Sequence, residues 1–158
     1  MKKWMWFCAA LLAALWLVAC APVEVPDEPL SLPFRGTELT VGMSASEALA
    51  ALGDDFVLSE SESCAGEGVD RMYTYPSLRL YVFVPAQGAA TVTSVSYTDD
   101  GAQTNEGLHI GSAVADVTAA LGEAEEQSES KLCYRCGGST LTFTLRQGRV
   151  SGILLSGE

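Results

Sequence analysis

Two fifteen-residue segments of this chain align with each other without a gap, and this similarity constrains the fold more than any other feature. The segments span residues 39–53 and 108–122. Six of the fifteen positions are identical, and both segments end in the sequence Ala-Ala-Leu-Gly. A similarity at this separation predicts that one structural unit occurs twice in the chain.

Each of the two segments is expected to contain a short helix. In the first, Ser44 followed by Glu47 matches a capping box, and apolar residues follow at helical spacing. In the second, Ser112 is the expected cap. Gly53 and Gly122 stand where a residue in a left-handed conformation would end each helix.

The sequence after each helix alternates between apolar and polar residues, which is typical of antiparallel strands with one covered face. The dipeptide Gln-Gly separates the strands of each pair. We therefore expect an α+β fold of two tandem repeats, each a short helix (or helix pair) packed on an antiparallel β-meander. The two repeats are expected to share one sheet or to lie edge to edge. The alternating runs cover residues 78–84, 92–97, 141–145 and 150–155.

The N-terminal residues resemble a bacterial lipoprotein signal with its lipobox. Lys2 and Lys3 precede an uncharged apolar run over residues 4–18, and Cys20 follows a small residue. The resemblance implies that residues 1–19 are cleaved and that Cys20 is acylated. An ordinary secretory signal with an incidental cysteine is the alternative. The apolar run is too short for a membrane-spanning helix.

Residues 20–36 are expected to form a lipid anchor followed by a proline-rich tether. Four prolines alternate with acidic residues here, a composition that favours extended polyproline-like structure. At about 3.1 Å per residue, such a tether would hold the folded part up to roughly 45 Å from a membrane. The expected location is therefore extracytoplasmic, anchored to a bacterial membrane by the lipid. The two repeats are expected at residues 37–104 and 105–158.

The charge of the chain restricts its partners. The net charge is −11. Removal of Lys2 and Lys3 with the signal leaves seven basic residues against 20 acidic ones, a net charge of −13. Such a surface repels nucleic acid, so no nucleic-acid partner is expected.

The folded part resembles the tandem-repeat fold of β-lactamase-inhibitor-type proteins and of small outer-membrane-assembly lipoproteins of the SmpA/OmlA kind. The two segments at 39–53 and 108–122 carry this resemblance. The chain is also similar to uncharacterised bacterial lipoproteins with a Cys-Ala-x-x-Gly-x-Asp motif, here residues 64–70, before a Tyr-x-Tyr strand, here residues 73–75. Their Thr-Asp-Asp connector matches residues 98–111. The resemblance implies a fold, and it supplies no catalytic residue.

The chemistry-bearing residues do not predict an enzyme. His109 is the single histidine, so a nucleophilic triad would have to be built around it. Acidic pairs such as Asp54-Asp55 lack the ligand spacing of a calcium loop. We expect no catalytic residue, no cofactor and no metal.

Three cysteines remain after the signal and the lipidated residue are set aside: Cys64, Cys133 and Cys136. In an exported protein a disulfide is the first expectation, and three cysteines leave one over. In an extended chain Cys133 and Cys136 lie about 10 Å apart, beyond the Cα limit of about 7 Å. Unless residues 133–138 form a turn, Cys64 is expected to pair with one of them and join the two repeats. A zinc site of these cysteines with His109 is disfavoured because the spacings match no zinc motif.

Five aromatic residues form the expected recognition surface, on strands of the first repeat. Either they cover the sheet and its seam, or they form an exposed face of the kind that proteins use for recognition. We favour recognition, because Leu78, Leu80 and Val82 already fill one face and the aromatics are expected to occupy the other. The five residues are Tyr73, Tyr75, Tyr81, Phe83 and Tyr97.

These observations predict a non-enzymatic, membrane-tethered binding module of the bacterial envelope with a protein partner. An inhibitor of an exported hydrolase is the first alternative, and it predicts an exposed loop at 99–107 or 59–70 that enters an active site. The second alternative is an envelope assembly factor, which predicts a stable stoichiometric complex in membranes.

Overall fold

The computed structural model describes residues 29–64 and 66–157. The expected signal, Cys20 and most of the expected tether lie outside these residues. No helix in the described part of the chain is long and apolar enough to cross a membrane.

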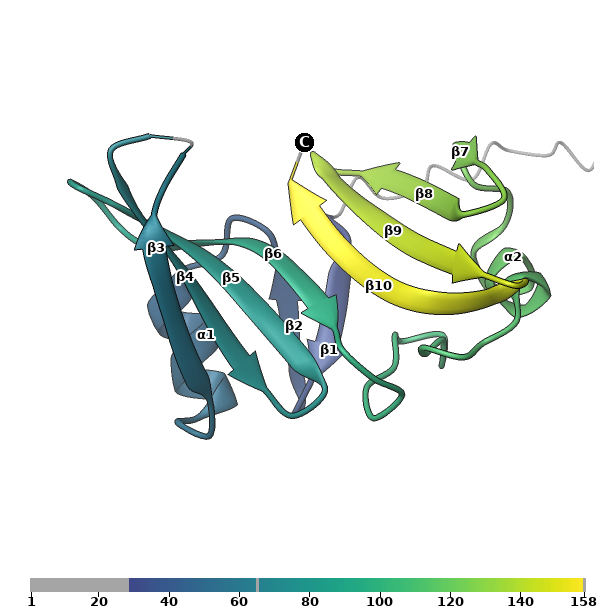
Figure 1. The fold of residues 1–158 in the computed structure, drawn as a ribbon, viewed down its shortest axis with the longest axis horizontal. Coiled ribbons are helices and arrows are strands. Elements are labelled where there is room, and N and C mark those ends of the chain that lie inside the picture. The colour runs from purple at the N-terminus through teal and green to yellow at the C-terminus, as the bar shows by residue number, and fades with distance from the viewer. Residues whose placement is uncertain (1–28, 65, 158) are drawn as a thin grey trace, which may run out of the picture.

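The dominant element is an eight-stranded antiparallel sheet with the order β3-β4-β5-β6-β10-β9-β8-β7 (Figure 1). Four strands lie where the alternation of apolar and polar residues places them, and two further strands precede each of the first and the third of these alternating runs. The bounds are β3 Val57–Glu62, β4 Gly68–Tyr75, β5 Leu78–Pro85, β6 Thr91–Tyr97, β7 Glu126–Gln127, β8 Lys131–Cys136, β9 Ser139–Arg146 and β10 Arg149–Gly157.

The pairing of β6 with β10 makes the sheet continuous. Tyr97 lies opposite Ile153, and Val95 lies opposite Leu155. All four side chains are buried on the inner face of the sheet. Strands that are more than 50 residues apart in the chain therefore share one hydrophobic core.

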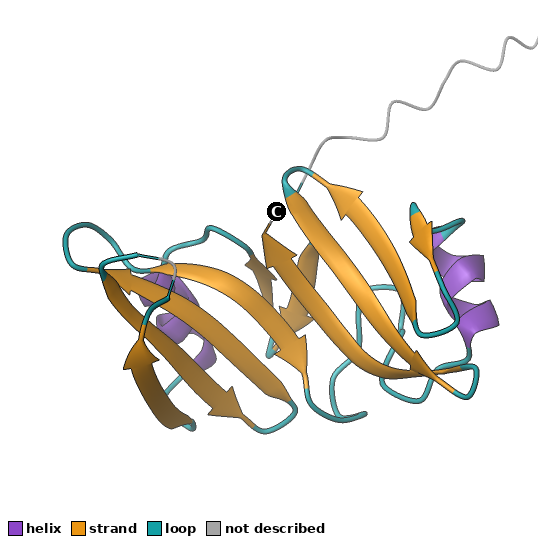
Figure 2. Cartoon of the chain, turned by 45° about the horizontal axis from the view of Figure 1, so that its top comes forward, coloured by secondary structure: helices purple, strands orange, loops and turns teal. Residues whose placement is uncertain are grey.

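A second layer covers the inner face of this sheet (Figure 2). It consists of the two-stranded hairpin β1 (Ser31–Phe34) and β2 (Thr37–Thr40) and of the helices α1 (Ala45–Leu52) and α2 (Val114–Leu121). Leu32 and Leu39 lie opposite each other in the hairpin and are fully buried. The helices α1 and α2 bury Ala48 and Val117 in the same core.

The expected α+β fold of two tandem helix-on-meander repeats is wrong: the protein is mostly β, with two helices in the described residues. An eight-residue helix is about 12 Å long, whereas eight strands span about 34 Å. Two such helices cover only part of the inner face. The β1–β2 hairpin covers the middle, and the sheet is one unit rather than two meanders.

The two similar segments make the same local contacts. The N–H groups of Gly42 and Gly111 donate 2.8 Å hydrogen bonds to the carbonyls of Val92 and Val150, respectively. These bonds place the start of each helix beside a strand of the sheet. The identical glycines have positive φ values of 82° and 108°, which explains why glycine occupies both positions.

The helix ends differ in detail from their prediction. Ser44 precedes α1 but makes no side-chain cap bond. The residue before α2 is Ala113 and not Ser112, and its N–H donates to Asp116 Oδ2 at 3.2 Å. Gly53 and Gly122 follow the helices with φ near 80°, but ψ is extended rather than left-handed helical.

The end of the proline-rich segment is folded. Residues 31–34, expected to belong to the tether, form β1 and bury Leu32. The N–H of Leu30 donates a 3.1 Å hydrogen bond to Ser139 Oγ at the start of β9. The described chain therefore enters the fold beside β9.

Candidate recognition surface

The five aromatics of the expected recognition surface lie on two opposite faces of the sheet. Tyr73 pairs with Leu80, and Tyr75 and Tyr97 both pair with Leu78. Because directly paired residues share a face, these three tyrosines point into the core, where they are buried. The expectation that all five aromatics lie opposite the leucines is wrong for Tyr73, Tyr75 and Tyr97.

The buried tyrosines have structural roles. The Tyr75 hydroxyl donates to the carbonyl of Gly53 at 3.0 Å, and the Tyr97 hydroxyl donates to the carbonyl of Pro33 at 2.6 Å. Burial raises the pKa of the Tyr97 hydroxyl well above its usual range, and the nearby Glu38 and Glu106 raise it further. These hydroxyls stay protonated and hold the second layer against the sheet.

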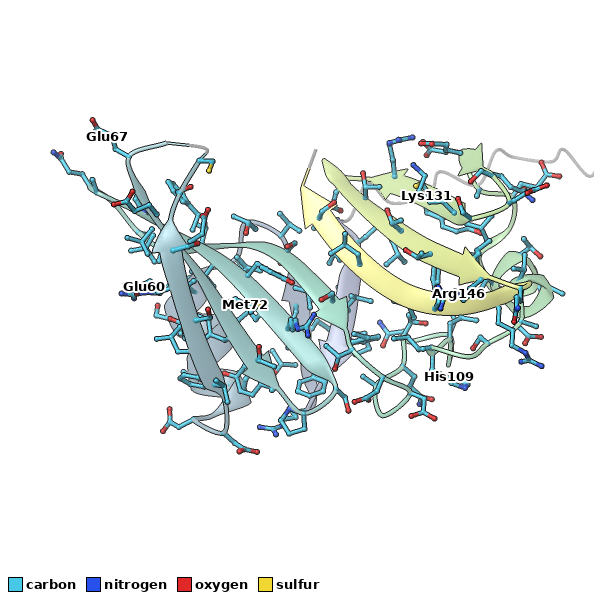
Figure 3. The ribbon with its side chains drawn as sticks, in the orientation of Figure 1. Glu60, Glu67, Met72, His109, Lys131 and Arg146 are labelled. Carbon is cyan, nitrogen blue, oxygen red and sulfur yellow. The ribbon has the colours of Figure 1, made fainter. Side chains whose placement is uncertain are left out.

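The remaining two aromatics, Tyr81 and Phe83, lie on the outer face of β5, away from α1 and the hairpin. Residues paired across four strands place Ser59, Met72, Tyr81 and Ser94 in one row on this face. Figure 3 shows Met72 on the face of the sheet turned away from α1. Met72, Tyr81 and Phe83 are each only half-buried.

These side chains border an open hollow of about 600 Å³ over β3–β6, here called the outer groove. Its apolar and aromatic surface comes from Met72, Tyr81 and Phe83, and hydroxyl groups of β3 and β6 surround this surface. An apolar surface with a few polar groups around it is typical of a recognition site. The outer groove is lined by Ser59, Asp70, Met72, Tyr81, Phe83 and Ser94 among others.

Met72 and the hydroxyl residues of β3 and β6 are members of this site that the sequence analysis missed. The sequence of β4 contains part of this information, because Asp70 and Met72 alternate with Tyr73 along the strand. The alternation separates their faces, but it does not say which face is outer. That assignment requires the β4–β5 register.

Gly68, the glycine of the Cys-Ala-x-x-Gly-x-Asp segment, shapes one end of the outer groove. A Cβ atom at this position would collide with the Val84 carbonyl and would lie within 3.0 Å of the Phe83 ring. Only glycine therefore lets β4 approach β5 this closely. This close approach fixes the Phe83 ring at the edge of the groove.

Two acidic side chains, Glu60 and Asp70, and one basic side chain, Arg71, line the outer groove. Along the chain, residues 54–71 contain six acidic side chains and one basic side chain, Arg71. Arg71 Nε forms a 2.7 Å ion pair with Glu60 Oε2, and this contact raises the pKa of Arg71. Figure 3 shows Glu60 beside the outermost strand of this end of the sheet.

Of the two segments expected as inhibitory loops, only residues 99–107 form a loop without helix or strand. Residues 59–70 are mainly parts of β3 and β4. In residues 99–107, Ala102 and Thr104 are buried, and Thr104 N donates to Leu108 O at 2.8 Å. The carbonyl of Gln103 lies 3.1 Å from the Tyr97 hydroxyl. This segment is therefore held against the body of the protein.

The structure separates Cys64 from the other two cysteines. Cys64 lies in the exposed β3–β4 connection, and Cys133 and Cys136 lie in β8. The sheet order places five strand spacings, about 24 Å, between β4 and β8. A disulfide between the two halves is therefore not formed. Cys64 and Cys133 are free thiols, and positions 133 and 136 of one strand point to opposite faces.

His109 belongs to a local turn. Its N–H donates to Ser112 Oγ at 3.0 Å, and its Nδ1 atom lies 3.3 Å from both Ser112 Oγ and the Gly107 carbonyl. These partners lie within three residues of His109, so the contacts stabilise the chain before α2. Within residues 29–64 and 66–157, no three His, Cys, Asp or Glu side chains gather closely enough to hold a metal ion.

No family model matches the chain, and no curated protein matches it. Among solved structures, the chain is similar to a DUF4309 family protein (YjgB) from Bacillus subtilis at 14% sequence identity and a TM-score of 0.44. The alignment covers 81% of this chain and 88% of that chain. At this TM-score, the likeness carries no conclusion about function.

Proposed function

We propose that this protein is a non-enzymatic binding module of the bacterial envelope, tethered to a membrane by a lipid on Cys20, and that it binds a protein partner through the outer groove. The observation that carries this proposal is the cluster of half-exposed Met72, Tyr81 and Phe83 side chains on an uncovered sheet face. Aromatic residues and methionine are enriched where proteins contact one another.

The position of the outer groove supports recognition away from the membrane. Leu30, where the described chain enters the fold, is bonded to β9. β9 and β3 are five strand spacings apart, or about 24 Å across the sheet. If the tether carries a lipid at its far end, the outer groove lies on the side of the domain opposite to the point where the tether enters.

The two alternatives have less support. An inhibitor of an exported hydrolase needs a protruding loop, whereas residues 99–107 bury Ala102 and Thr104. An envelope assembly factor would also use an exposed face, and the identity of the captured partner separates it from other binding modules.

Site-specific photocrosslinking of the full-length lipidated protein in membranes of its source bacterium tests the proposal. A photoreactive phenylalanine analogue is placed at Tyr81 or at Ser59 in the outer groove. The matched control carries it at Ala119, an exposed position on α2. We expect one dominant protein adduct from both groove positions and none from the control.

Equal labelling at the three positions, or no adduct at either groove position, would overturn the proposed binding surface. Mass spectrometry of the adduct then identifies the class. A hydrolase would favour the inhibitor alternative, and an envelope complex at unit stoichiometry would favour the assembly factor.

A further inference from the structure

β3 forms one edge of the eight-stranded sheet, and its outer side has no partner strand in the described residues (Figure 1). All six of its residues are exposed. Val57 and Leu58, adjacent in β3, are exposed by 72% and 46%. Long exposed edge strands are usually avoided in proteins because they pair with other chains. An exposed apolar start on such an edge therefore points to a binding function.

The hydrogen-bond pattern shows which backbone groups face the free edge. Ser63 N donates to Gly68 O at 3.1 Å, which makes this the hydrogen-bonded pair that closes the β3–β4 hairpin. Hydrogen-bonded and non-bonded pairs alternate along an antiparallel ladder. The N–H and C=O groups of Leu58, Glu60 and Glu62 therefore point away from β4 toward the free edge.

Two of these three residues, Glu60 and Glu62, carry a negative charge and add a charge preference. Glu60 and Glu62 lie two positions apart and share one face of β3. Glu60 is paired with Arg71, and Glu62 makes no ion pair within the described residues. The surrounding segment, residues 54–71, carries six acidic residues against one basic residue. This edge is therefore complementary to a positively charged strand.

A second copy of this chain fits the edge poorly. Full antiparallel overlap of two β3 strands, paired through their outward residues, places Glu60 directly opposite the Glu60 of the other copy. Like charges in this position destabilise a strand pair. The net charge of −11 adds long-range repulsion between copies.

We propose that the free edge of β3 binds an extended basic segment of a partner protein, which adds to the sheet as an antiparallel strand. This inference rests on the proposed function and names the class of partner segment. Basic side chains opposite Glu60 and Glu62 face these carboxylates. The alternate side chains lie beside Ser59 and Ser61, where the added strand extends the outer groove. Backbone pairing supplies affinity, and the alternating side chains supply specificity.

A capped hexapeptide, Lys-Val-Lys-Val-Lys-Val, tests this proposal by fluorescence anisotropy against the full-length lipidated protein in a neutral detergent. In the proposed register, the lysine N–H groups bond to β3 and the valine N–H groups face solvent. Methylation of the backbone nitrogens of the three lysines is therefore expected to weaken binding at least tenfold. Methylation of the backbone nitrogens of the three valines is expected to change the affinity less than threefold. Equal effects of the two modifications would overturn the proposal.

A pair of protein variants makes the complementary test. Glu60→Pro removes an outward N–H, a place where an edge strand tolerates proline, and is expected to weaken peptide binding more than tenfold. Glu60→Ala keeps the N–H and removes only the charge, so we expect a loss below fivefold. Circular dichroism establishes that both variants fold. If Glu60→Pro fails to fold, the two methylated peptides still decide the question.

Two further results would overturn the edge proposal without affecting the proposed function. The first is equal affinity for Lys-Lys-Lys-Val-Val-Val, which would indicate attraction by charge alone. The second is a dimer in sedimentation equilibrium that Glu60→Pro abolishes, which would place a second copy on the edge. If crosslinking at Tyr81 persists after either of these results, the proposed binding function is still supported.

Discussion

The Tyr97 hydroxyl donates a 2.6 Å hydrogen bond to the Pro33 carbonyl oxygen, and this bond joins β6 to the hairpin that covers the core. Tyr97 is only 3% exposed. We expect Tyr97→Phe to destabilise the protein by about 1–3 kcal/mol, because the partly buried Pro33 carbonyl loses its donor. Urea denaturation followed by circular dichroism measures the change.

Tyr81→Phe is the matched control for this bond, since the Tyr81 hydroxyl makes no hydrogen bond within the described residues and lies on the outer face. We expect a change below about 0.5 kcal/mol, as for other surface substitutions. Equal losses in the two variants would mean that the Tyr97–Pro33 bond does not contribute to stability.

The raised pKa of Tyr97 predicts destabilisation at alkaline pH. A tyrosine in the unfolded chain ionises near pH 10, at about its reference value. Burial keeps Tyr97 protonated above that pH, so the folded state binds more protons than the unfolded state. The stability is fully present below about pH 10 and falls above it, by up to about 1.4 kcal/mol per pH unit for this group. Tyr75, whose pKa burial also raises, acts in the same direction.

Denaturation curves between pH 8 and pH 11 check this expectation. The slope of the unfolding free energy against pH is expected to be smaller in Tyr97→Phe, because that variant cannot lose the proton. A slope that is identical in the variant and the parent protein would contradict the assignment.

Gly68 and Gly66 form a second matched pair. Gly68→Ala is expected to cost about 1–3 kcal/mol, because the added methyl group collides with the Val84 carbonyl and the Phe83 ring. At Gly66 the nearest atom would lie 3.9 Å from the added Cβ, so Gly66→Ala is expected to be nearly neutral. Thermal unfolding measures both. A neutral Gly68→Ala would mean that β4 and β5 do not approach as closely as described.

The cysteines are expected to differ in reactivity. Cys64 is exposed, whereas Cys133 is 2% exposed between β7 and β9. A maleimide reagent should therefore label Cys64 in the folded protein and label Cys133 only after denaturation. Peptide mass spectrometry locates the label. A marked drop in the melting temperature of Cys64→Ser would mean that Cys64 is bonded to another part of the protein. That result would contradict the distance between Cys64 and the two cysteines of β8.

The proposed attachment of a lipid at Cys20 can be tested directly. Cys20→Ala is expected to prevent acylation and processing at this site, because the acyl chains need the cysteine. Fractionation should then find the lipid-modified parent protein, but not the variant, in the detergent phase of a Triton X-114 separation. Ala21→Ser is a control that leaves the cysteine in place. Cleavage and soluble release of the parent protein would instead indicate an ordinary secretory signal.

Local order was predictable because its physical causes are local. The alternation from residue 78 to 84 follows from one buried face, and β5 forms there. The helical spacing before Gly53 and Gly122 likewise corresponds to α1 and α2. The prediction for residues 31–34 was wrong, because it assigned their proline to an extended tether. Pro33 lies in a strand of a two-stranded sheet, where the lack of an N–H is tolerated.

The candidate site was predictable only in part. Alternation places Tyr81 and Phe83 on one face of β5 and Leu80 on the other, and this division is correct. Tyr73 and Tyr75 belong to another strand, and a shift of one residue in the β4–β5 register would reverse their faces. The sequence of β4 alone carries no information on that register.

The sequence by itself determined the positions of both helices and of the alternating strands β5, β6, β9 and β10, since each depends on residues close together in the chain. It also determined the acidic net charge. The tertiary structure alone decided that β6 pairs with β10, that Tyr97 reaches Pro33 and that β3 is left as a free edge. These features depend on which distant apolar surfaces bury one another. Many pairings satisfy the same local pattern, and the shared core selects among them.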